Sequence, residues 1–194
     1  IWILSDEIYE KLNFSTEETL SILHIDKKLK ERTLVVNGFS KGYCMTGWRL
    51  GYIGAPNKIA KACTKIQGQF TSGTSSITQR AAISALRKKP DFTKKMNIEF
   101  MKRRDMAVKM LEKIPNIKFN IPQGAFYIFI DFSSYLNTKY KSFKIKSNDD
   151  LSMYLLNNAE VATVSGSAFG NKECIRISIA SSKKDIKEAL NRIK

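Results

Sequence analysis

A lysine and an arginine eight residues apart are the side chains of this sequence with the clearest chemical potential. Lys41 follows the apolar run 33–36, and Arg49 comes after it. A lysine at the end of a buried strand is partly desolvated, which favours the neutral amine that Schiff-base chemistry needs. An arginine close by can hold a phosphate dianion through two hydrogen bonds. Together the two predict a site for a phosphorylated aldehyde, although a lysine after a core strand is, taken alone, more often a surface residue.

The stretch 37–52 around these residues resembles the lysine motif of class I and II aminotransferases, the fold type I enzymes that bind pyridoxal 5'-phosphate. In that motif a small residue stands three before the lysine and another just before it, here Gly38 and Ser40. The run 45–52 is similar to the bacterial aspartate aminotransferases in particular. Cys44 departs from the pattern, because the family usually has a small residue without a thiol there, and we interpret it as packing variation.

The resemblance assigns a role to each polar residue of the motif. Lys41 would hold the cofactor covalently and then move a proton between the substrate α-carbon and the cofactor. Arg49 would bind the cofactor phosphate together with the hydroxyl of Ser40. Some relatives have a serine where this chain has Gly38, so the phosphate site is less complete on that side.

Asp6 and Tyr9 follow directly on the first apolar run of the chain. In an open α/β sheet, ligands collect at the carboxyl ends of strands, so a carboxylate placed there points into the site. The resemblance implies that Asp6 keeps the pyridine nitrogen of the cofactor protonated, and that Tyr9 donates its hydroxyl to the 3'-oxygen. Taken alone, an Asp-x-x-Tyr sequence would be interpreted as a solvated turn.

Arg176 lies in the alternating run 174–180, which places isoleucines on one face of a strand and Arg176 with Ser178 on the other. An arginine flanked by core isoleucines must face a cleft or a partner charge, since an unpaired buried guanidinium is costly. The resemblance identifies it as the residue that binds the substrate α-carboxylate through two hydrogen bonds; a structural ion pair is the alternative. The preceding loop 165–170 is similar to a family loop that shapes the cleft, and Phe126 and Tyr127 are interpreted as core and wall.

Composition bounds the class of protein. The chain has 194 residues, 43% of them apolar, and a formal net charge of +15. Its lysines are spread along the chain rather than gathered into an arm, so we expect no nucleic-acid partner. No apolar run approaches membrane-spanning length. The three cysteines have no metal-like spacing, so we expect no metal site and a reducing cytoplasmic setting.

The apolar runs 1–5, 33–37 and 50–54, separated by long connections, predict strands of an α/β sheet. Between the first two, Ser15 and Glu18 have the spacing of a helix capping box. A helix is expected to open at Pro56, with apolar residues recurring at helical spacing up to Phe70, and a second helix at 77–87. The polar stretch 71–76 between them resembles a loop that reaches toward the partner subunit in family homodimers.

A long amphipathic helix from Pro90 to about Ile114 is expected to join two domains, residues 1–90 and 91–194. The second would be a small α+β domain. Its expected elements are a strand pair or bent strand over 118–131, strands at 162–164 and 174–180, and two helices. Ser147 and Asp150 have the spacing of a capping box before the first helix, and Ser182 with Asp185 is expected to cap the last helix, 183–193.

The chain begins without methionine inside an apolar strand, and the resemblance corresponds only to the second half of an aminotransferase. We therefore expect the C-terminal part of a fold type I enzyme: the end of the large-domain sheet plus the small α+β domain. The expected activity is aspartate-type transamination between an L-amino acid and a 2-oxo acid such as 2-oxoglutarate, by a homodimer. The alternatives are a ligand-sensing aminotransferase-like domain of a transcription regulator, and a C–S lyase that uses the same residues.

Overall fold

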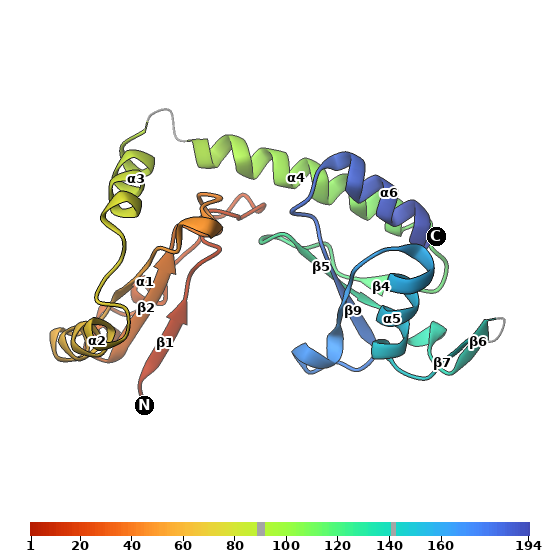
Figure 1. Cartoon of the computed structure of the whole chain (residues 1–194), viewed down its shortest axis with the longest axis horizontal. Helices are drawn as coiled ribbons and strands as arrows, with labels where there is room; N and C mark the ends of the chain where they lie inside the picture. The colour runs from red at the N-terminus through yellow and green to blue at the C-terminus, as the bar shows by residue number, and fades with distance from the viewer. Residues whose placement is uncertain (89–91, 141–142) are drawn as a thin grey trace. The chain divides into compact units, whose positions relative to one another are not determined.

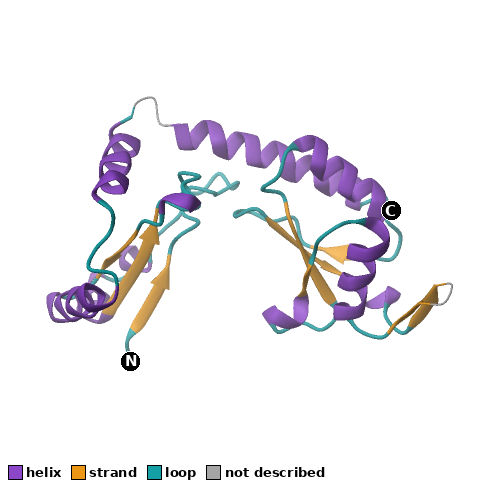
Figure 2. Cartoon of the chain, in the orientation of Figure 1, coloured by secondary structure: helices purple, strands orange, loops and turns teal. Residues whose placement is uncertain are grey.

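The computed structural model describes residues 1–88, 92–140 and 143–194, and the chain divides into two compact units, Ile1–Asn97 and Ile98–Lys194. Each unit has its own sheet and its own helices (Figures 1 and 2). The domain boundary predicted between residues 90 and 91 lies outside the described residues, as does the predicted helix start at Pro90.

The first unit contains a three-stranded sheet in the order β1-β2-β3. Its strands are β1 (Ile3–Asp6), β2 (Thr33–Gly38) and β3 (Gly51–Gly54), so all three predicted apolar runs form strands. β1 is parallel to β2, with Asp6 opposite Val36, whereas β3 is antiparallel to β2. A parallel pair needs a long crossover, and residues 7–32 supply it.

The crossover differs from the prediction. Its helix α1 (Ile22–Ile25) begins with a reciprocal capping box. The side chain of Ser21 accepts a backbone N–H of the first turn, and the backbone N–H of Ser21 donates to Nδ1 of His24. A 3-10 helix, η1 (Lys27–Arg32), follows. The expected capping box at Ser15 is wrong, because Asn13 Oδ1 accepts both the backbone N–H and the hydroxyl of Ser15, at 2.9 and 2.7 Å. The hydroxyl of Ser15 is therefore engaged in a local turn and caps no helix.

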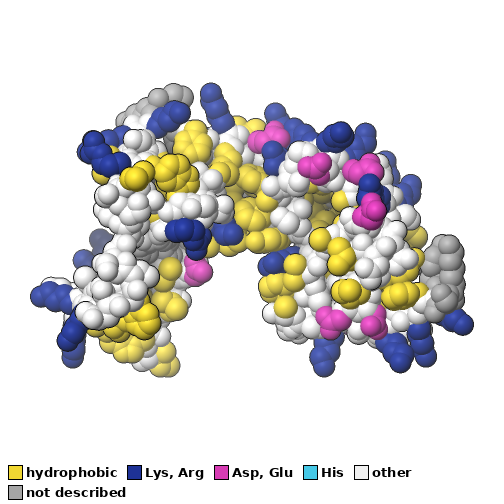
Figure 3. Space-filling view, in the orientation of Figure 1, with side chains coloured by type: hydrophobic (Ala, Val, Ile, Leu, Met, Phe, Trp, Pro, Cys, Tyr) yellow, Lys and Arg dark blue, Asp and Glu magenta, His cyan; other side chains and the backbone are white. Residues whose placement is uncertain are grey.

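Two helices follow the sheet, α2 (Asn57–Phe70), with Pro56 at its N-cap, and α3 (Ser76–Arg87). The helical spacing of apolar residues correctly predicted both, but no residue of α2 is buried. Phe70 is 82% exposed and Ile77, in α3, is 75% exposed. Figure 3 also shows hydrophobic side chains at the surface near the N-terminus, where Leu4 is 70% exposed. Large apolar side chains of β1, α2 and α3 therefore reach the surface.

The second unit has a four-stranded sheet in the order β4-β5-β9-β8, and all its neighbouring strands are antiparallel. The helix α4 (Phe92–Leu111) begins in the first unit and continues into this one. The remaining elements in chain order are β4 (Lys118–Phe119), β5 (Tyr127–Asp131), η3 (Ser133–Tyr135), β6 (Thr138–Tyr140), β7 (Phe143–Ile145), α5 (Asn148–Ala159), β8 (Val164–Ser165), η4 (Gly166–Phe169), β9 (Cys174–Ser178) and α6 (Lys183–Ile193).

One face of this sheet packs against α4, α5 and α6 to form the core of the second unit. Ile128 lies opposite Ile177, and Ile130 opposite Ile175, so these side chains share a face. They form one cluster with residues of all three helices, among them Leu111, Leu151 and Leu190. The strand pair expected over 118–131 is confirmed as β4 and β5. The strand expected at 162–164 is displaced to the two residues of β8, and the β6–β7 hairpin was not predicted.

The structure confirms the predicted capping box at Ser147 and the predicted helix cap at Ser182. Ser147 accepts from the backbone of Asp150 and Ser182 accepts from the backbone of Asp185, at the starts of α5 and α6. The carboxylate of Asp150 closes the first box by accepting from the backbone of Ser147. These contacts satisfy N–H groups that a helix start leaves without partners.

Within the described residues, no helix has both the length and the apolar content needed to cross a lipid bilayer. The same residues contain no cluster of three histidine, cysteine or acidic side chains arranged to hold a metal ion.

Candidate active site

The carboxyl ends of β1 and β2 meet at one edge of the first sheet and carry most of the predicted site. Asp6 is the last residue of β1, and the pairing continues one residue further, since Glu7 donates its N–H to the carbonyl of Val36 at 2.9 Å. The side chain of Asp6 is exposed, and its Oδ1 accepts the N–H of Ile8 at 3.1 Å. A carboxylate thus stands at the strand end, as the sequence predicted.

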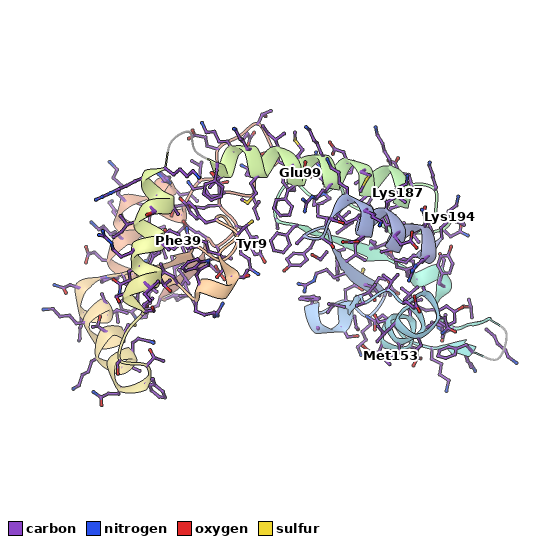
Figure 4. The ribbon with its side chains drawn as sticks, turned by 45° about the horizontal axis from the view of Figure 1, so that its top comes forward. Tyr9, Phe39, Glu99, Met153, Lys187 and Lys194 are labelled. Carbon is purple, nitrogen blue, oxygen red and sulfur yellow. The ribbon has the colours of Figure 1, made fainter. Side chains whose placement is uncertain are left out.

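Tyr9 and Lys41 come together beside this strand end. The Nζ atom of Lys41 lies over the Tyr9 ring, 5.9 Å from its centroid. The turn that carries Tyr9 is closed by two backbone hydrogen bonds, Glu10 to Glu7 and Leu12 to Tyr9, and Leu12 is only 1% exposed. A buried leucine therefore anchors this turn. Figure 4 labels Tyr9 and Phe39, the buried residue that directly follows β2.

Glu7 supports the same turn, and sequence reasoning gave it no role. One oxygen of its carboxylate accepts the hydroxyl of Ser5 at 3.0 Å and the hydroxyl of Ser21 at 2.6 Å. Ser21 also caps α1, so Glu7 ties the crossover helix to the end of β1. The position of Glu7 directly after Asp6 was the only sequence signal for a role near the site. Its contact with Ser21 is formed only in the folded chain.

Two glycines near Lys41, Gly38 and Gly42, are closely packed. A Cβ atom on Gly38 would lie 2.9 Å from the carbonyl oxygen of Leu50 and 3.0 Å from the Cα of Gly51. One on Gly42 would lie 3.0 Å from side-chain carbons of Lys11. Contacts shorter than van der Waals distance force the backbone to move. The absence of a serine at position 38 therefore has a structural reason in this chain.

Arg49 and Ser40 belong to the loop between β2 and β3, which includes the 3-10 helix η2 (Thr46–Trp48). Arg49 has a left-handed backbone, with φ 54° and ψ 53°, and its Nη1 donates to the carbonyl of Thr46 at 2.8 Å. Its side chain is exposed. Within the described residues, the half-buried hydroxyl of Ser40 makes no hydrogen bond. Both groups can therefore bind an added anion.

An aromatic cluster packs beneath this loop. The ring centroid of Phe39 lies 5.0 Å from that of Tyr43 and 6.2 Å from that of Tyr52. Phe39 and Met45 form a small buried core with Ala82 of α3. Burial, reinforced by the Glu10 carboxylate, raises the pKa of Tyr52 above its ordinary value of 10.0. Tyr52 therefore stays a neutral phenol at physiological pH.

Arg176 lies on the open face of the second unit's sheet, opposite Phe129 of β5 and Val164 of β8. The isoleucines on either side of it in the strand are buried, which confirms the predicted alternation. Its guanidinium carbon is 4.1 Å from the ring centroid of Tyr127 and 4.1 Å from that of Phe169. In the part of the chain that the structure describes, no carboxylate lies within ion-pair distance of Arg176. The structural ion pair considered as an alternative is therefore not formed there.

The loop that supplies Phe169 is fixed by Asn148, which sequence reasoning missed. Asn148 is 1% exposed. Its Oδ1 accepts the hydroxyl of Ser167 at 2.8 Å, and its Nδ2 donates to the carbonyls of Asn171 and Cys174. A Cβ atom on Gly166 would lie 2.4 Å from the Cys174 carbonyl oxygen, so the loop packs directly on β9. A buried amide that is fully hydrogen-bonded is a structural element, not a ligand-binding one.

Comparison with known proteins identifies the family. The family model described as "Aminotransferase class I and II" matches residues 1–193. The chain belongs to this family. The resemblance of the lysine motif is confirmed by a match that extends over nearly the whole sequence.

Curated members of this family with similar sequences carry related names. The chain is 45% identical over 196 residues to a bifunctional aspartate aminotransferase and glutamate/aspartate-prephenate aminotransferase of Petunia hybrida, covering 99% of this chain and 41% of that protein. It is 43% identical over 194 residues to an aspartate aminotransferase of Rhizobium meliloti strain 1021, covering 100% of this chain and 47% of that protein. The chain thus spans about half the length of the curated relatives it matches.

Solved structures of the family confirm the predicted fold class. The aspartate aminotransferase from Rhizobium meliloti superposes with a TM-score of 0.94 at 42% identity, covering 99% of this chain and 48% of that chain. An aromatic aminotransferase from Pyrococcus horikoshii superposes with a TM-score of 0.88 at 33% identity, covering 100% and 50%. The α/β arrangement is therefore that of part of a class I and II aminotransferase.

Proposed function

We propose that this chain belongs to an aspartate-type aminotransferase, which moves an amino group between an L-amino acid and a 2-oxo acid such as 2-oxoglutarate with pyridoxal 5'-phosphate as cofactor. The observation that carries the proposal is the position of the Lys41 amine over the Tyr9 ring, at the strand edge that ends in Asp6. The names of the relatives support the aspartate-type reaction.

The donor set at this edge fits the cofactor. A carboxylate, a phenol, an amine and a guanidinium are the groups that a protonated pyridine, a phenolate oxygen, an aldehyde and a phosphate would need. When bound, pyridoxal phosphate supplies an electron sink for the substrate α-carbon. The crowded backbone at Gly38 leaves Ser40 and Arg49 to bind the phosphate from this loop.

Each side chain then has a defined task. Asp6 holds a proton on the pyridine nitrogen through its negative charge. Tyr9 donates its hydroxyl to the 3'-oxygen. Lys41 would hold the cofactor covalently through Nζ, and its free amine would carry a proton to and from the substrate α-carbon. Its place over an aromatic face limits where that amine can move.

Arg176 is proposed to bind the substrate α-carboxylate through its two outward N–H groups. The lack of a carboxylate partner among the described residues supports this role, because a half-buried guanidinium gains most from an anionic ligand. The proposal gives the second unit the task of substrate recognition and the first unit the task of holding the cofactor.

The assembly and setting are also proposals. Family membership supports amino acid and 2-oxo acid substrates and a homodimer, and the exposed hydroxyl-rich stretch Thr71–Ser76 is a candidate for contacts with the second subunit. The three cysteines form no disulfide within the described residues, which supports a reducing cytoplasmic setting.

The test uses the full-length protein. Reduction with borohydride should fix the cofactor onto Lys41, as detected by peptide mass mapping, and Lys41→Ala should fold yet lose transamination of L-aspartate with 2-oxoglutarate by several orders of magnitude. Lys58→Ala, at an exposed position of α2, is the matched control and should retain activity. Label on a peptide centred on another lysine would refute the assignment of Lys41.

A further inference from the structure

The guanidinium carbon of Arg176 lies over two aromatic rings, those of Tyr127 and Phe169. We propose that Tyr127 and Phe169 are positioning residues, which hold the Arg176 guanidinium so that only its N–H edge is presented to the substrate α-carboxylate. The proposal rests on the proposed role of Arg176 and adds what makes that role selective.

The geometry is that of a double cation–π contact. Both ring centroids lie 4.1 Å from the guanidinium carbon, well inside the distance of about 6 Å at which such contacts attract. A guanidinium directs all its N–H groups outward in its own plane, and its faces offer no hydrogen bonds. Rings that pack on these faces would leave the hydrogen-bonding edge uncovered. An anion that approaches in the plane can accept two parallel hydrogen bonds, which suits a carboxylate.

The two rings come from different elements, and each is held by further aromatic contacts. Tyr127, on β5, packs at 4.7 Å against Phe126, which stacks at 5.7 Å on Phe100 of α4. Phe169, at the end of η4, meets Phe129 edge to face at 6.1 Å. We call the rings of Tyr127 and Phe169 the clamp. The clamp contacts the core through Phe126 and the strand opposite Arg176 through Phe129.

The loop that carries Phe169 is held as firmly as the strand. Asn148 binds Ser167 on the loop and the carbonyl of Cys174 at the start of β9, so loop and strand share one buried amide. Phe169 itself is 47% exposed. Contact with the Arg176 cation explains why this large aromatic side chain keeps its position although nearly half of it is exposed to solvent.

Pre-ordering explains why such a clamp would favour binding. An arginine side chain has many rotamers, and ordering it when the substrate arrives would reduce affinity. The two rings restrict Arg176 before the carboxylate arrives, and they retain its charge without supplying a competing anion. Their loss should therefore weaken substrate binding more than it slows the chemical step.

The experiment compares ring variants in the full-length enzyme. Phe169→Leu should raise the KM for L-aspartate and for 2-oxoglutarate by roughly tenfold, as expected for a partly desolvated cation–π contact, and should leave kcat within about twofold. Phe169→Tyr keeps the ring and should recover most of the lost affinity. The matched control is Phe143→Leu, which removes a similar edge-to-face ring, 5.2 Å from Tyr154, elsewhere in the same unit.

A second readout separates positioning from general damage. β-Alanine is the amine that remains when the α-carboxylate of aspartate is removed, so it cannot use Arg176 in the same way. Its slow reaction should be unchanged in Phe169→Leu, and the preference for L-aspartate over β-alanine should fall by roughly tenfold. Equal losses with both amines would mean that the ring only supports the fold, and would overturn the clamp.

Arg176→Lys distinguishes failure of the clamp from failure of the proposed function. A lysine keeps the charge but loses the planar fork, so L-aspartate should be used about a hundredfold less efficiently. If Arg176→Lys impairs the reaction and Phe169→Leu does not, the clamp proposal fails while the role of Arg176 stands. If Arg176→Lys leaves aspartate kinetics unchanged, the proposed role of Arg176 fails with it.

Discussion

The thiol of Cys44 lies 2.9 Å from the thioether sulfur of Met96, which joins the loop after Lys41 to the second turn of α4. The neighbouring ring of Tyr43 packs edge to face on Phe92 of the same helix, with centroids 5.8 Å apart. Cys44 itself has a left-handed backbone, with φ 54°. The start of α4 thus holds the turn in which the carbonyl of Lys41 accepts the N–H of Cys44 at 3.2 Å. The cysteine interpreted as packing variation has a specific packing partner.

Met96→Ala should therefore loosen the Lys41 loop as well as reduce stability. The side chain is half-buried, so we expect the free energy of unfolding to fall by about 1–2 kcal/mol, below the cost of a fully buried methionine. Urea denaturation of the full-length protein measures the loss. Met153→Ala, at a position of α5 that is 51% exposed, is the matched control and should change stability little. Equal effects of the two variants would show that the sulfur contact contributes nothing specific.

Gly38→Ala tests whether crowding, and not a missing hydroxyl, determines the residue at this position. The new methyl group would lie 2.9 Å from the Leu50 carbonyl oxygen, a backbone atom that cannot rotate away. We expect a loss of about 1–3 kcal/mol in the free energy of unfolding, together with weaker cofactor retention, because Leu50 directly follows Arg49.

Gly54→Ala is the control for this prediction. Gly54 ends β3 in the same sheet, and a Cβ atom there meets nothing within 4 Å. This variant should have nearly the parent melting temperature. If Gly38→Ala is equally well tolerated, the close approach of β2 and the 49–51 backbone does not constrain the loop.

Much of the fold followed from local sequence signals. The helix caps at Ser147 and Ser182 were predictable because a cap uses residues only three apart. The alternation around Arg176 was predictable because a strand fixes the side on which each residue lies. The role assigned to Lys41 came from the family resemblance and stays a prediction, although the structure brings Lys41 to Tyr9 as that role requires.

Other features depended on contacts that no local pattern encodes. Ser15 and Glu18 have capping-box spacing, but Asn13 engages Ser15 first. The spacing of apolar residues predicted α2 correctly, yet could not reveal that Phe70 would be 82% exposed. The clamp around Arg176 joins residues 127, 169 and 176, which only the sheet register and the η4 loop bring together.

Arg49→Ala should separate phosphate binding from folding. The side chain is exposed and, among the residues that the structure describes, donates only to the carbonyl of Thr46 within its own loop, so the melting temperature should change little. Pyridoxal 5'-phosphate should dissociate far more readily, whereas the already weak binding of pyridoxal, which lacks the phosphate, should be unaffected. Equilibrium dialysis with each compound measures this difference. Arg87→Ala, at an exposed position of α3, is the control, and equal losses for both compounds would contradict the phosphate role.

Asp131, at the end of β5, should make the free energy of unfolding depend on pH in the acidic range. Its Oδ1 accepts the N–H of Ser133 at 2.7 Å, and this hydrogen bond, with a further one from the Ser133 hydroxyl, lowers the pKa of Asp131 below its ordinary value of 3.8. A carboxyl group whose pKa is lower in the folded state stabilises the fold above its unfolded pKa. That stability is lost as the pH falls through the folded pKa. Asp131→Asn keeps a carbonyl acceptor but removes the charge.

The melting temperature of Asp131→Asn should lie below that of the parent by a constant amount from pH 7 to about pH 5, because Asp131 is fully ionised throughout that range. The gap should narrow below the ordinary pKa of 3.8 and close at still lower pH. Thermal unfolding followed by circular dichroism across this range measures the gap. A difference that persists unchanged in strong acid would show that Asp131 acts through its shape and not through its charge.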